Sequence, residues 1–429
     1  MGGNSFRIQE VKTVVTILGV LCSFMLNGRT LEVCPSCEFK DVQSAYAFAS
    51  DGDVLLIKQG VYTVSELIVE KAISIRGEEG AIFDGNGSTI LYIHHDSVSI
   101  SDIQLRNVST NYIEDRAALK CNNSDYLVIR NVVVRHSFFG ILVEKSKHGI
   151  IENCDVKGDA TTDSYLESSN GNAIHLWYCK NMTIRNNQIR NHRDGIYFEF
   201  VDKSKIENNW SESNMRYGLH FMFSHENEYR GNTFHKNGAG VAVMYSTKVV
   251  MENNQFVDNW GTSSYGLLLK DITDSRLSEN LFANNTIAIS ADNTMRCSIE
   301  NNRFDGNGYA FRVMGNCTDN VISANDFLQN SFDVTTNSRS NYNDFTGNFW
   351  EEYSGYDLNS DGIGDIPFRP VKLFTYIIAQ SPASIILMRS TFIDLLNLAE
   401  KVTPVLTPES LVDIKPQMKL INDHLKLSF

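Results

Sequence analysis

Thioether and imidazole side chains recur at a regular spacing in the middle of this sequence. One residue separates His220 from Met222, Met244 follows Met222 after 22 positions, and His175 lies upstream. Soft sulfur ligands combined with imidazole select Cu(I) over hard cations. The residue types and their spacing therefore predict a Cu(I) site at His220, Met222 and Met244, with His175 on the same face. The alternative for the two methionines is a protein-docking patch, because Met side chains adapt to varied partners.

A second group of oxygen donors lies near the C-terminal end. Donors alternate with other residues around Gly362, as in the first half of a calcium-binding loop. These donors are Asp357, Asn359, Asp361 and Asp365. The Glu that would complete such a loop is replaced by Phe368. Calcium binding and an Asx-rich turn without metal are therefore both open interpretations.

A third candidate is the Cys-x-x-Cys pair formed by Cys34 and Cys37. In an oxidising compartment this pair would form a local disulfide. A thiolate pair that binds Cu(I) and a redox pair are the other two interpretations. Eight cysteines are present, and Cys22 lies in a segment that we expect to be removed. The odd number that remains predicts at least one thiol that is free or pairs with another chain.

A repeat that fills the middle of the chain must position these residues. An Asn followed two residues later by an aromatic or apolar side chain recurs roughly every 22 residues. The leading residues are Asn187, Asn208, Asn232, Asn254, Asn280, Asn302, Asn325 and Asn343. Short β-branched and aromatic runs at this period predict an all-β fold, a right-handed parallel β-helix or solenoid. The Asn side chains should form a ladder, and the aromatic side chains after them should stack in the core.

The register of a second run in each coil decides which side chains face outward. These runs start at Gly or Ala, as in Gly218-Leu-His-Phe-Met222 and Gly240-Val-Ala-Val-Met244. Side chains alternate between the faces of a strand, and the second and fourth positions are apolar, so the third and fifth should face outward. The copper prediction depends on this register, which places Met222 and Met244 on neighbouring coils.

The chain divides into three parts. Residues 1–30 carry an apolar run after Arg7 and Lys12, which indicates a secretory signal peptide. A retained membrane anchor is the alternative. Both interpretations place the rest of the chain outside the cytoplasm. Residues 31–370 form the β-helix, with a helix at 41–49 that covers its open end.

Residues 371–429 form a C-terminal helix and arm. We expect Ser381 to start this helix, which presents apolar side chains to a membrane partner. The docking residues are Met388, Phe392, Leu395 and Leu396.

Composition excludes some function classes. The net charge is −13, which argues against a nucleic-acid-binding protein because binding phosphates requires Lys and Arg. The sequence contains no Gly-x-x-x-x-Gly-Lys-Ser/Thr loop, so ATP hydrolysis in this chain is excluded.

Several long runs closely resemble the NosD family. They include Asp194-Gly-Ile-Tyr-Phe-Glu-Phe-Val, Arg216-Tyr-Gly-Leu-His-Phe-Met-Phe-Ser224, Gly240-Val-Ala-Val-Met-Tyr-Ser246, Tyr265-Gly-Leu-Leu-Leu-Lys270 and Gly355-Tyr-Asp-Leu-Asn-Ser-Asp-Gly-Ile-Gly-Asp365. The resemblance covers most of the chain after the signal peptide and is strongest from about residue 194 to residue 416.

The resemblance implies a β-helix component of the periplasmic system that matures nitrous oxide reductase. It implies assembly with the ATPase NosF and the permease NosY of an ABC transporter, and association with the membrane through that permease. It also implies a copper chaperone, NosL, as partner and the reductase, NosZ, as client. The expected role is to help assemble the copper–sulfide cluster, by handling Cu(I) or by docking its chaperone, and not to act as an enzyme.

The alternative function is that of a β-helix polysaccharide lyase or epimerase, or of a carbohydrate-binding protein. His175, Tyr197, His220, Lys270 and Arg312 are expected on the outer face and offer acid, base and charge-stabilising groups. Apolar side chains alternate with them, whereas a groove for uronic acids should be more cationic. A purely structural scaffold is a third possibility.

Overall fold

The computed structural model describes residues 28–111, 113–160, 170–338, 340–387, 390–393, 395–396 and 411–427. The signal peptide expected over 1–30 lies almost wholly outside these ranges, as does Met388. Within them, none of the helices has the length and apolar character that crossing a membrane requires.

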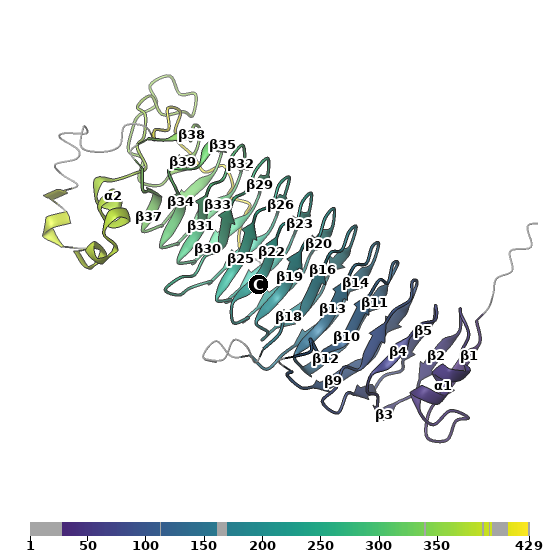
Figure 1. Cartoon of the computed structure of the whole chain (residues 1–429). Helices are drawn as coiled ribbons and strands as arrows, with labels where there is room; N and C mark the ends of the chain where they lie inside the picture. The colour runs from purple at the N-terminus through teal and green to yellow at the C-terminus, as the bar shows by residue number, and fades with distance from the viewer. Residues whose placement is uncertain are drawn as a thin grey trace, which may run out of the picture.

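The strands form three long parallel sheets that wind together into a rod (Figure 1). Sheet 1 contains β1 Thr30–Val33, β2 Val54–Ile57, β5 Ser74–Gly77, β8 Ser99–Ser101, β11 Val128–Arg130, β14 Ile150–Glu152, β17 Thr183–Arg185, β20 Lys205–Glu207, β23 Glu228–Arg230, β26 Val250–Glu252, β29 Arg276–Ser278, β32 Ser298–Glu300, β35 Thr318–Ser323 and β38 Tyr342–Asp344. Sheet 2 contains β3 Gly60–Thr63, β6 Ala81–Asp84, β9 Gln104–Val108, β12 Val133–Ser137, β15 Asp155–Lys157, β18 Gln188–Arg190, β21 Trp210–Glu212, β24 Thr233–His235, β27 Gln255–Val257, β30 Leu281–Ala283, β33 Arg303–Asp305, β36 Asp326–Leu328 and β39 Phe349–Trp350. Sheet 3 contains β4 Leu67–Val69, β7 Leu91–Ile93, β10 Ala117–Asn122, β13 Phe139–Glu144, β16 Ile174–Trp177, β19 Asp194–Glu199, β22 Tyr217–Met222, β25 Ala239–Met244, β28 Leu267–Lys270, β31 Ile287–Asp292, β34 Tyr309–Val313 and β37 Phe332–Thr336.

This arrangement confirms the parallel β-helix. Each strand pairs with the equivalent strand of the coil before and the coil after it, as β11 pairs with β8 and β14. Strand spacing of about 4.8 Å makes a rod of roughly 60 Å from the 13 strands of sheet 2.

An Asn ladder runs through the interior at one corner of the coils. The amide N–H of Asn232 donates to Oδ1 of Asn254 at 3.0 Å, and the amide N–H of Asn254 donates to Oδ1 of Asn280 at 3.0 Å. Its members are Asn187, Asn209, Asn232, Asn254, Asn280, Asn302, Asn325 and Asn348. The expectation was wrong for Asn208 and Asn343. Asn208 occupies the preceding left-handed position with φ 53°, and Asn343 bonds to Asn320 at another corner.

The predicted stack of aromatic rings fills the core beside this ladder. Successive ring centroids lie between 4.2 and 5.4 Å apart, and the ring planes are nearly parallel. The stack consists of Phe234, Phe256, Phe282, Phe304, Phe327 and Trp350. Ladder and stack together fix the register that positions the outer face.

The N-terminal end of the rod carries the expected short helix. Helix α1, Val42–Phe48, begins after Asp41, whose carboxylate accepts the backbone N–H of Ser44 at 2.8 Å. Val42 and Ala45 are buried against the first coil, so α1 covers apolar surface at this end.

The C-terminal end differs in detail from the sequence expectation. Helix α2, Leu373–Gln380, was not predicted, and Ser381 is its C-cap. The helical segment expected after Ser381 does begin at Pro382, but it is short. A 3-10 helix, η2, follows at Pro382–Leu387. Phe374 and Ile378 of α2 pack on Phe332 of β37, so the helix lies on the outer face of sheet 3.

Residues 411–427, called the arm below, return to the rod (Figure 1). Asp413 is fully buried and accepts the N–H of Asn348, which ends the Asn ladder, at 2.9 Å. Further along, the amide N–H groups of Ile421 and Asn422 donate to Asp326 at 3.0 and 2.7 Å. The arm therefore runs backwards along the solenoid from its last coil.

Candidate functional site

The two candidate copper methionines lie side by side on the outer face of sheet 3. Strand pairing places Met222 of β22 directly beside Met244 of β25. Both side chains are half-buried, so they are accessible from outside the core. Glu199 precedes them in the same column and Lys270 follows them. The register predicted from the sequence thus brings two thioethers together on neighbouring coils.

His220 lies in the adjacent column and is more deeply covered than the sequence suggested. It is only 6% exposed, because the rings of Tyr197 and Tyr217 pack against it at centroid distances of 5.0 and 4.8 Å. Both of its ring nitrogens are buried; Nε2 has no hydrogen-bond partner, and Nδ1 has the carboxylate of Asp194 at 3.9 Å. Buried polar atoms without a partner are uncommon and frequently mark functional positions. The donor set of two thioethers and an imidazole suits Cu(I).

The structure does not bring His175 together with the other candidate ligands. The ring of Tyr197 stands between it and His220, at 4.7 Å from His175 and 5.0 Å from His220. Burial, with a contribution from the nearby charge of Arg193, lowers the pKa of His175 to about 4. His175 is therefore a neutral packing partner on this face.

Sequence reasoning missed Asp194, which is fully buried beneath the same face. Its carboxylate accepts a hydrogen bond from Nε of Arg216 at 2.9 Å and lies 3.9 Å from Nδ1 of His220. Burial acts to raise the pKa of Asp194, but His220 and Arg216 outweigh this effect and hold the pKa below its usual value. The available signal was Gly195, where an added Cβ would lie 2.5 Å from the carbonyl oxygen of Gly218.

A column of stacked aromatic rings borders the methionines and was also missed. Tyr178, Phe200, Phe223 and Tyr245 lie on successive coils, and we call them the aromatic stack. Their centroids are 4.6, 5.3 and 4.9 Å apart, with ring planes within 18° of parallel. Phe223 directly follows Met222, and Tyr245 directly follows Met244. The sequence signal was an aromatic residue after the fifth position of four consecutive runs.

The aromatic stack is unusual in backbone conformation and in orientation. All four residues have φ between 50° and 56°, a left-handed region that bulky side chains rarely adopt. Asp271 and Asn293 hold the same position in the next coils, with φ 55° and 48°. Because the rings stack on one another along the rod, their faces are covered and their edges are turned outward. The stack therefore offers an apolar strip in which the ring faces between neighbouring coils are covered.

The acidic loop of the calcium prediction is bonded to itself. The carboxylate oxygens of Asp357 accept the amide N–H groups of Asp361 and Gly362 at 3.2 and 2.9 Å. Asn359 Oδ1 accepts the N–H of Asp361 at 3.1 Å, and Asp365 Oδ2 accepts the N–H of Leu358 at 2.7 Å. In the described part of the chain, no three His, Cys, Asp or Glu side chains converge as a metal site. The geometry is that of an Asx-rich turn.

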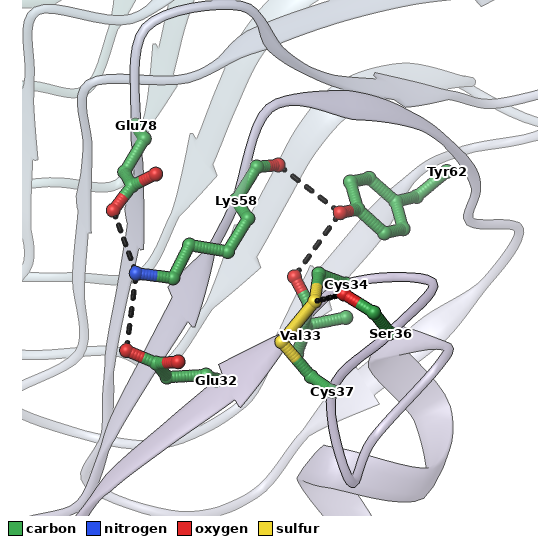
Figure 2. The surroundings of a disulfide bond; sticks show 8 residues. All are labelled: Glu32, Val33, Cys34, Ser36, Cys37, Lys58, Tyr62 and Glu78. Atoms are coloured by element: carbon green, nitrogen blue, oxygen red, sulfur yellow. Dashed lines mark hydrogen bonds and ion pairs between the residues drawn. A yellow bond between two sulfur atoms is a disulfide. The ribbon is translucent and has the colours of Figure 1, made fainter.

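Cys34 and Cys37 form a disulfide at the N-terminal end of the rod (Figure 2). Both residues are partly exposed, and Sγ of Cys34 lies 3.3 Å from the hydroxyl of Ser36. The other cysteines within the described ranges are buried and free, namely Cys121, Cys154, Cys179, Cys297 and Cys317.

The predicted docking residues of the tail fall into different environments. Phe392 and Leu395 are 56% and 64% exposed. Leu396 instead packs against the cluster formed by α2 and β37. The sequence interpretation overlooked Ile386, which is 86% exposed.

Comparison with known proteins shows what this chain is similar to. A family model described as "Periplasmic copper-binding protein (NosD)" matches residues 156–355. A "Probable ABC transporter binding protein NosD" from Pseudomonas aeruginosa is 28% identical over 372 residues, which is 82% of this chain and 85% of that protein. A protein of the same description from Stutzerimonas stutzeri is 28% identical over 388 residues, 86% of each chain. The chain is therefore similar to NosD proteins over most of its length.

The NosD match includes some of the candidate features and excludes others. Residues 156–355 contain His220, Met222, Met244 and the whole aromatic stack. The Cys34–Cys37 disulfide and the tail after β39 lie outside that range. The outer face of sheet 3 is therefore the part of the candidate site that the NosD family model covers.

Solved structures share the fold of this chain. The A-module of mannuronan C-5 epimerase AlgE6 from Azotobacter vinelandii superposes with a TM-score of 0.59 at 13% identity, covering 72% of this chain and 94% of that chain. The surface adhesin PfbA of Streptococcus pneumoniae superposes with a TM-score of 0.51 at 14% identity, covering 69% and 88%. At such identities the likeness concerns the β-helix alone.

Proposed function

We propose that this chain is a periplasmic accessory protein that holds Cu(I) transiently at Met222 and Met244, with His220 as the third ligand. In this role it works with an ABC transporter in assembling the copper–sulfide cluster of nitrous oxide reductase. The observation that carries the proposal is the pairing of two half-exposed thioethers on neighbouring strands beside a buried imidazole whose Nε2 has no hydrogen-bond partner. The family description as copper-binding supports the metal.

The proposed ligands suit a cargo that must leave again. Two thioethers and one imidazole are neutral, so the site adds no charge that would retain a hard cation or hold copper as tightly as thiolates do. The thioethers are half-exposed whereas His220 is covered, so a partner would reach the metal from the methionine side.

The aromatic stack supports docking of a copper chaperone next to this site. Left-handed backbone at a bulky residue costs roughly 1 kcal/mol, and four consecutive coils carry that cost at a corner where later coils have Asp and Asn. An apolar strip of ring edges beside the methionines would bring a partner's own copper ligands close to them. We assign NosL-type chaperones to this strip.

The segment that follows the last coil, from α2 to residue 396, is the proposed attachment to the transporter permease. Ile386, Phe392 and Leu395 are exposed apolar side chains on a segment that leaves the rod at its last coil. The relatives' description as ABC transporter binding proteins supports such an attachment. NosF and NosY as subunits and NosZ as client belong to the same proposal.

An anaerobic Cu(I) competition titration tests the metal assignment. Met222→Leu with Met244→Leu keeps the side-chain volume and removes both sulfurs. We expect the affinity for Cu(I) to fall at least tenfold while the unfolding temperature stays the same. Met314→Leu, at another half-buried methionine, is the matched control and should bind like the wild type. Equal affinity in the double variant would exclude these ligands.

A polysaccharide-modifying role is the second candidate. The observation that favours it is the Asp194–Arg216 pair beside Tyr197 and His220 on the outer face. The stacked, edge-on rings next to this group oppose it, because sugars pack on ring faces. Release or epimerisation of uronate from alginate or pectin by the purified chain would favour the enzyme over the copper protein.

A further inference from the structure

Among the described cysteines, the reactive sulfur atoms are those of one surface pair. Burial raises the pKa of the Cys154 thiol to about 12 and those of the Cys179 and Cys297 thiols to about 11. Such thiols are poor nucleophiles and poor metal ligands. Cys34 and Cys37 are instead partly exposed and adjacent. Among the cysteines of the described residues, theirs are the sulfur atoms that a reductant or a metal ion from solution can reach together.

Contacts other than the disulfide also hold the loop that carries this pair. The N–H of Cys34 donates to the carbonyl of Phe39 at 3.0 Å, and the N–H of Cys37 donates to the carbonyl of Cys34 at 3.1 Å. The buried hydroxyl of Tyr62 lies 3.0 Å from the carbonyl oxygen of Val33 (Figure 2). Phe39 packs on the core and on Phe48 of α1. Reduction would therefore leave two thiols facing each other, with Cα atoms about 5 Å apart as in the bonded loop.

From this geometry we infer that Cys34 and Cys37 form a second Cu(I) site, closed as a disulfide and opened by reduction to a dithiolate. The Met222–Met244 pair lies about eight strand spacings away, roughly 40 Å along the rod. The two sites therefore bind copper independently. The inference extends the proposed function, and its own test does not depend on the methionines.

The charges around the pair favour a metal over a thiol–disulfide catalyst. A catalytic Cys-x-x-Cys pair needs nearby positive charge to lower its thiol pKa. Figure 2 shows Lys58 beside the pair. Its ammonium group forms ion pairs with Glu32 at 3.0 Å and Glu78 at 2.9 Å, so two carboxylates neutralise its charge. A bound metal deprotonates thiols without such help. No third His, Cys, Asp or Glu ligand converges here within the described ranges, which disfavours tetrahedral Zn²⁺ and suits Cu(I).

The opening step balances with a dithiol as reductant. A thiolate of the dithiol attacks one sulfur of the disulfide, the Cys34–Cys37 bond breaks, and a mixed disulfide forms. The second thiol of the reductant then attacks the mixed disulfide and releases the pair. Cys34 and Cys37 gain two electrons and two protons, and the dithiol leaves as a disulfide. Cu(I) then binds both sulfurs and displaces the two protons.

Anaerobic Cu(I) titration of the mature chain, before and after treatment with dithiothreitol and its removal, tests this inference. We expect reduction to add one equivalent of bound Cu(I). X-ray absorption of the added copper should show sulfur ligands. Cys34→Ser with Cys37→Ser should lose the added equivalent and keep the binding seen without reduction. Met222→Leu with Met244→Leu should keep the added equivalent, which separates this site from the methionine site.

Two results would overturn the inference. One is equal Cu(I) binding before and after reduction of the wild type. The other is an added equivalent that persists in the double serine variant, which would place the metal on the buried cysteines. If the serine variant unfolds at a lower temperature, alkylating the reduced wild-type pair with iodoacetamide gives the same comparison. Alkylation must then add two groups per chain and abolish the added equivalent.

Discussion

Replacing Asp413 by Asn should detach the arm from the rod. The carboxylate accepts four N–H groups: Gly347 and Lys415 at 2.9 Å on one oxygen, and Asn348 at 2.9 Å and the Trp350 indole at 2.8 Å on the other. An Asn side chain has one oxygen, so either orientation turns an NH₂ group toward two donors. Losing two hydrogen bonds to a charged acceptor costs about 3–6 kcal/mol.

This cost would appear as local opening of the arm. Every 1.4 kcal/mol is a tenfold change in an equilibrium constant. The equilibrium population of the state with a detached arm should therefore rise about 100-fold or more relative to the wild type. Hydrogen exchange followed by mass spectrometry measures this directly in peptides covering 411–427. We expect their protection to fall in Asp413→Asn while the middle coils exchange as in the wild type.

Asp423→Asn is the matched control on the same arm. Its side chain is 64% exposed, and its ion pairs with Lys426 and Arg303 are 3.3 and 3.6 Å long. Exposed pairs of this kind contribute about 0–1 kcal/mol, so arm protection should change little. Unaltered exchange in Asp413→Asn, or an equal loss in Asp423→Asn, would refute the assignment of Asp413 as the arm's anchor.

Three further predictions concern the rod. Burial lowers the pKa of His192 to about 4, below the usual 6.5 or so. Between those values the unfolded chain binds more protons, so stability falls as the pH falls through that window. His192→Asn should therefore reduce the drop in unfolding temperature between pH 7 and 5, and an unchanged drop would contradict this. Asn254→Ala removes hydrogen bonds to both neighbouring coils and should lower the free energy of unfolding by about 2–4 kcal/mol, measured by denaturant titration. The control is Asn253→Gly, at an exposed position with φ 54°, which should lower the free energy of unfolding by less than about 1 kcal/mol. Calcium or a chelator should leave the midpoint of thermal unfolding unchanged, because the oxygen atoms around Asp361 already accept the loop's own amide N–H groups. A rise of several degrees with calcium would support calcium binding by this loop instead.

The sequence was sufficient for the solenoid because its period is local and repeated. Each Asn and each core aromatic occurs once per coil, so a spacing near 22 residues predicts both the ladder and the stack. The errors at Asn208 and Asn343 have one cause. Adjacent or nearby Asn residues compete for the ladder position, and only the backbone turn decides which side chain points inward.

The candidate site was predictable in register and not in burial. Alternation places His220 on the outer face, but its cover comes from Tyr197 and Tyr217, whose sizes matter only once they are side by side. Asp194 is the first residue of β19 and pairs with Tyr217, and alternation alone would group its side chain with the inward Ile196 and Phe198. Asp413 is separated from Asn348 by 65 positions, and no periodic signal links them.

The direction of the Asn ladder has a consequence for assembly. Every backbone N–H of the ladder donates toward the C-terminal end, so this row is polarised and its last N–H, on Asn348, would be left without an acceptor. Another rod could supply that acceptor and stack end to end as a filament. Asp413 brings a negative charge to this electropositive terminus and occupies it from within the same chain. The polypeptide thereby ends its own ladder with an acceptor from the same chain.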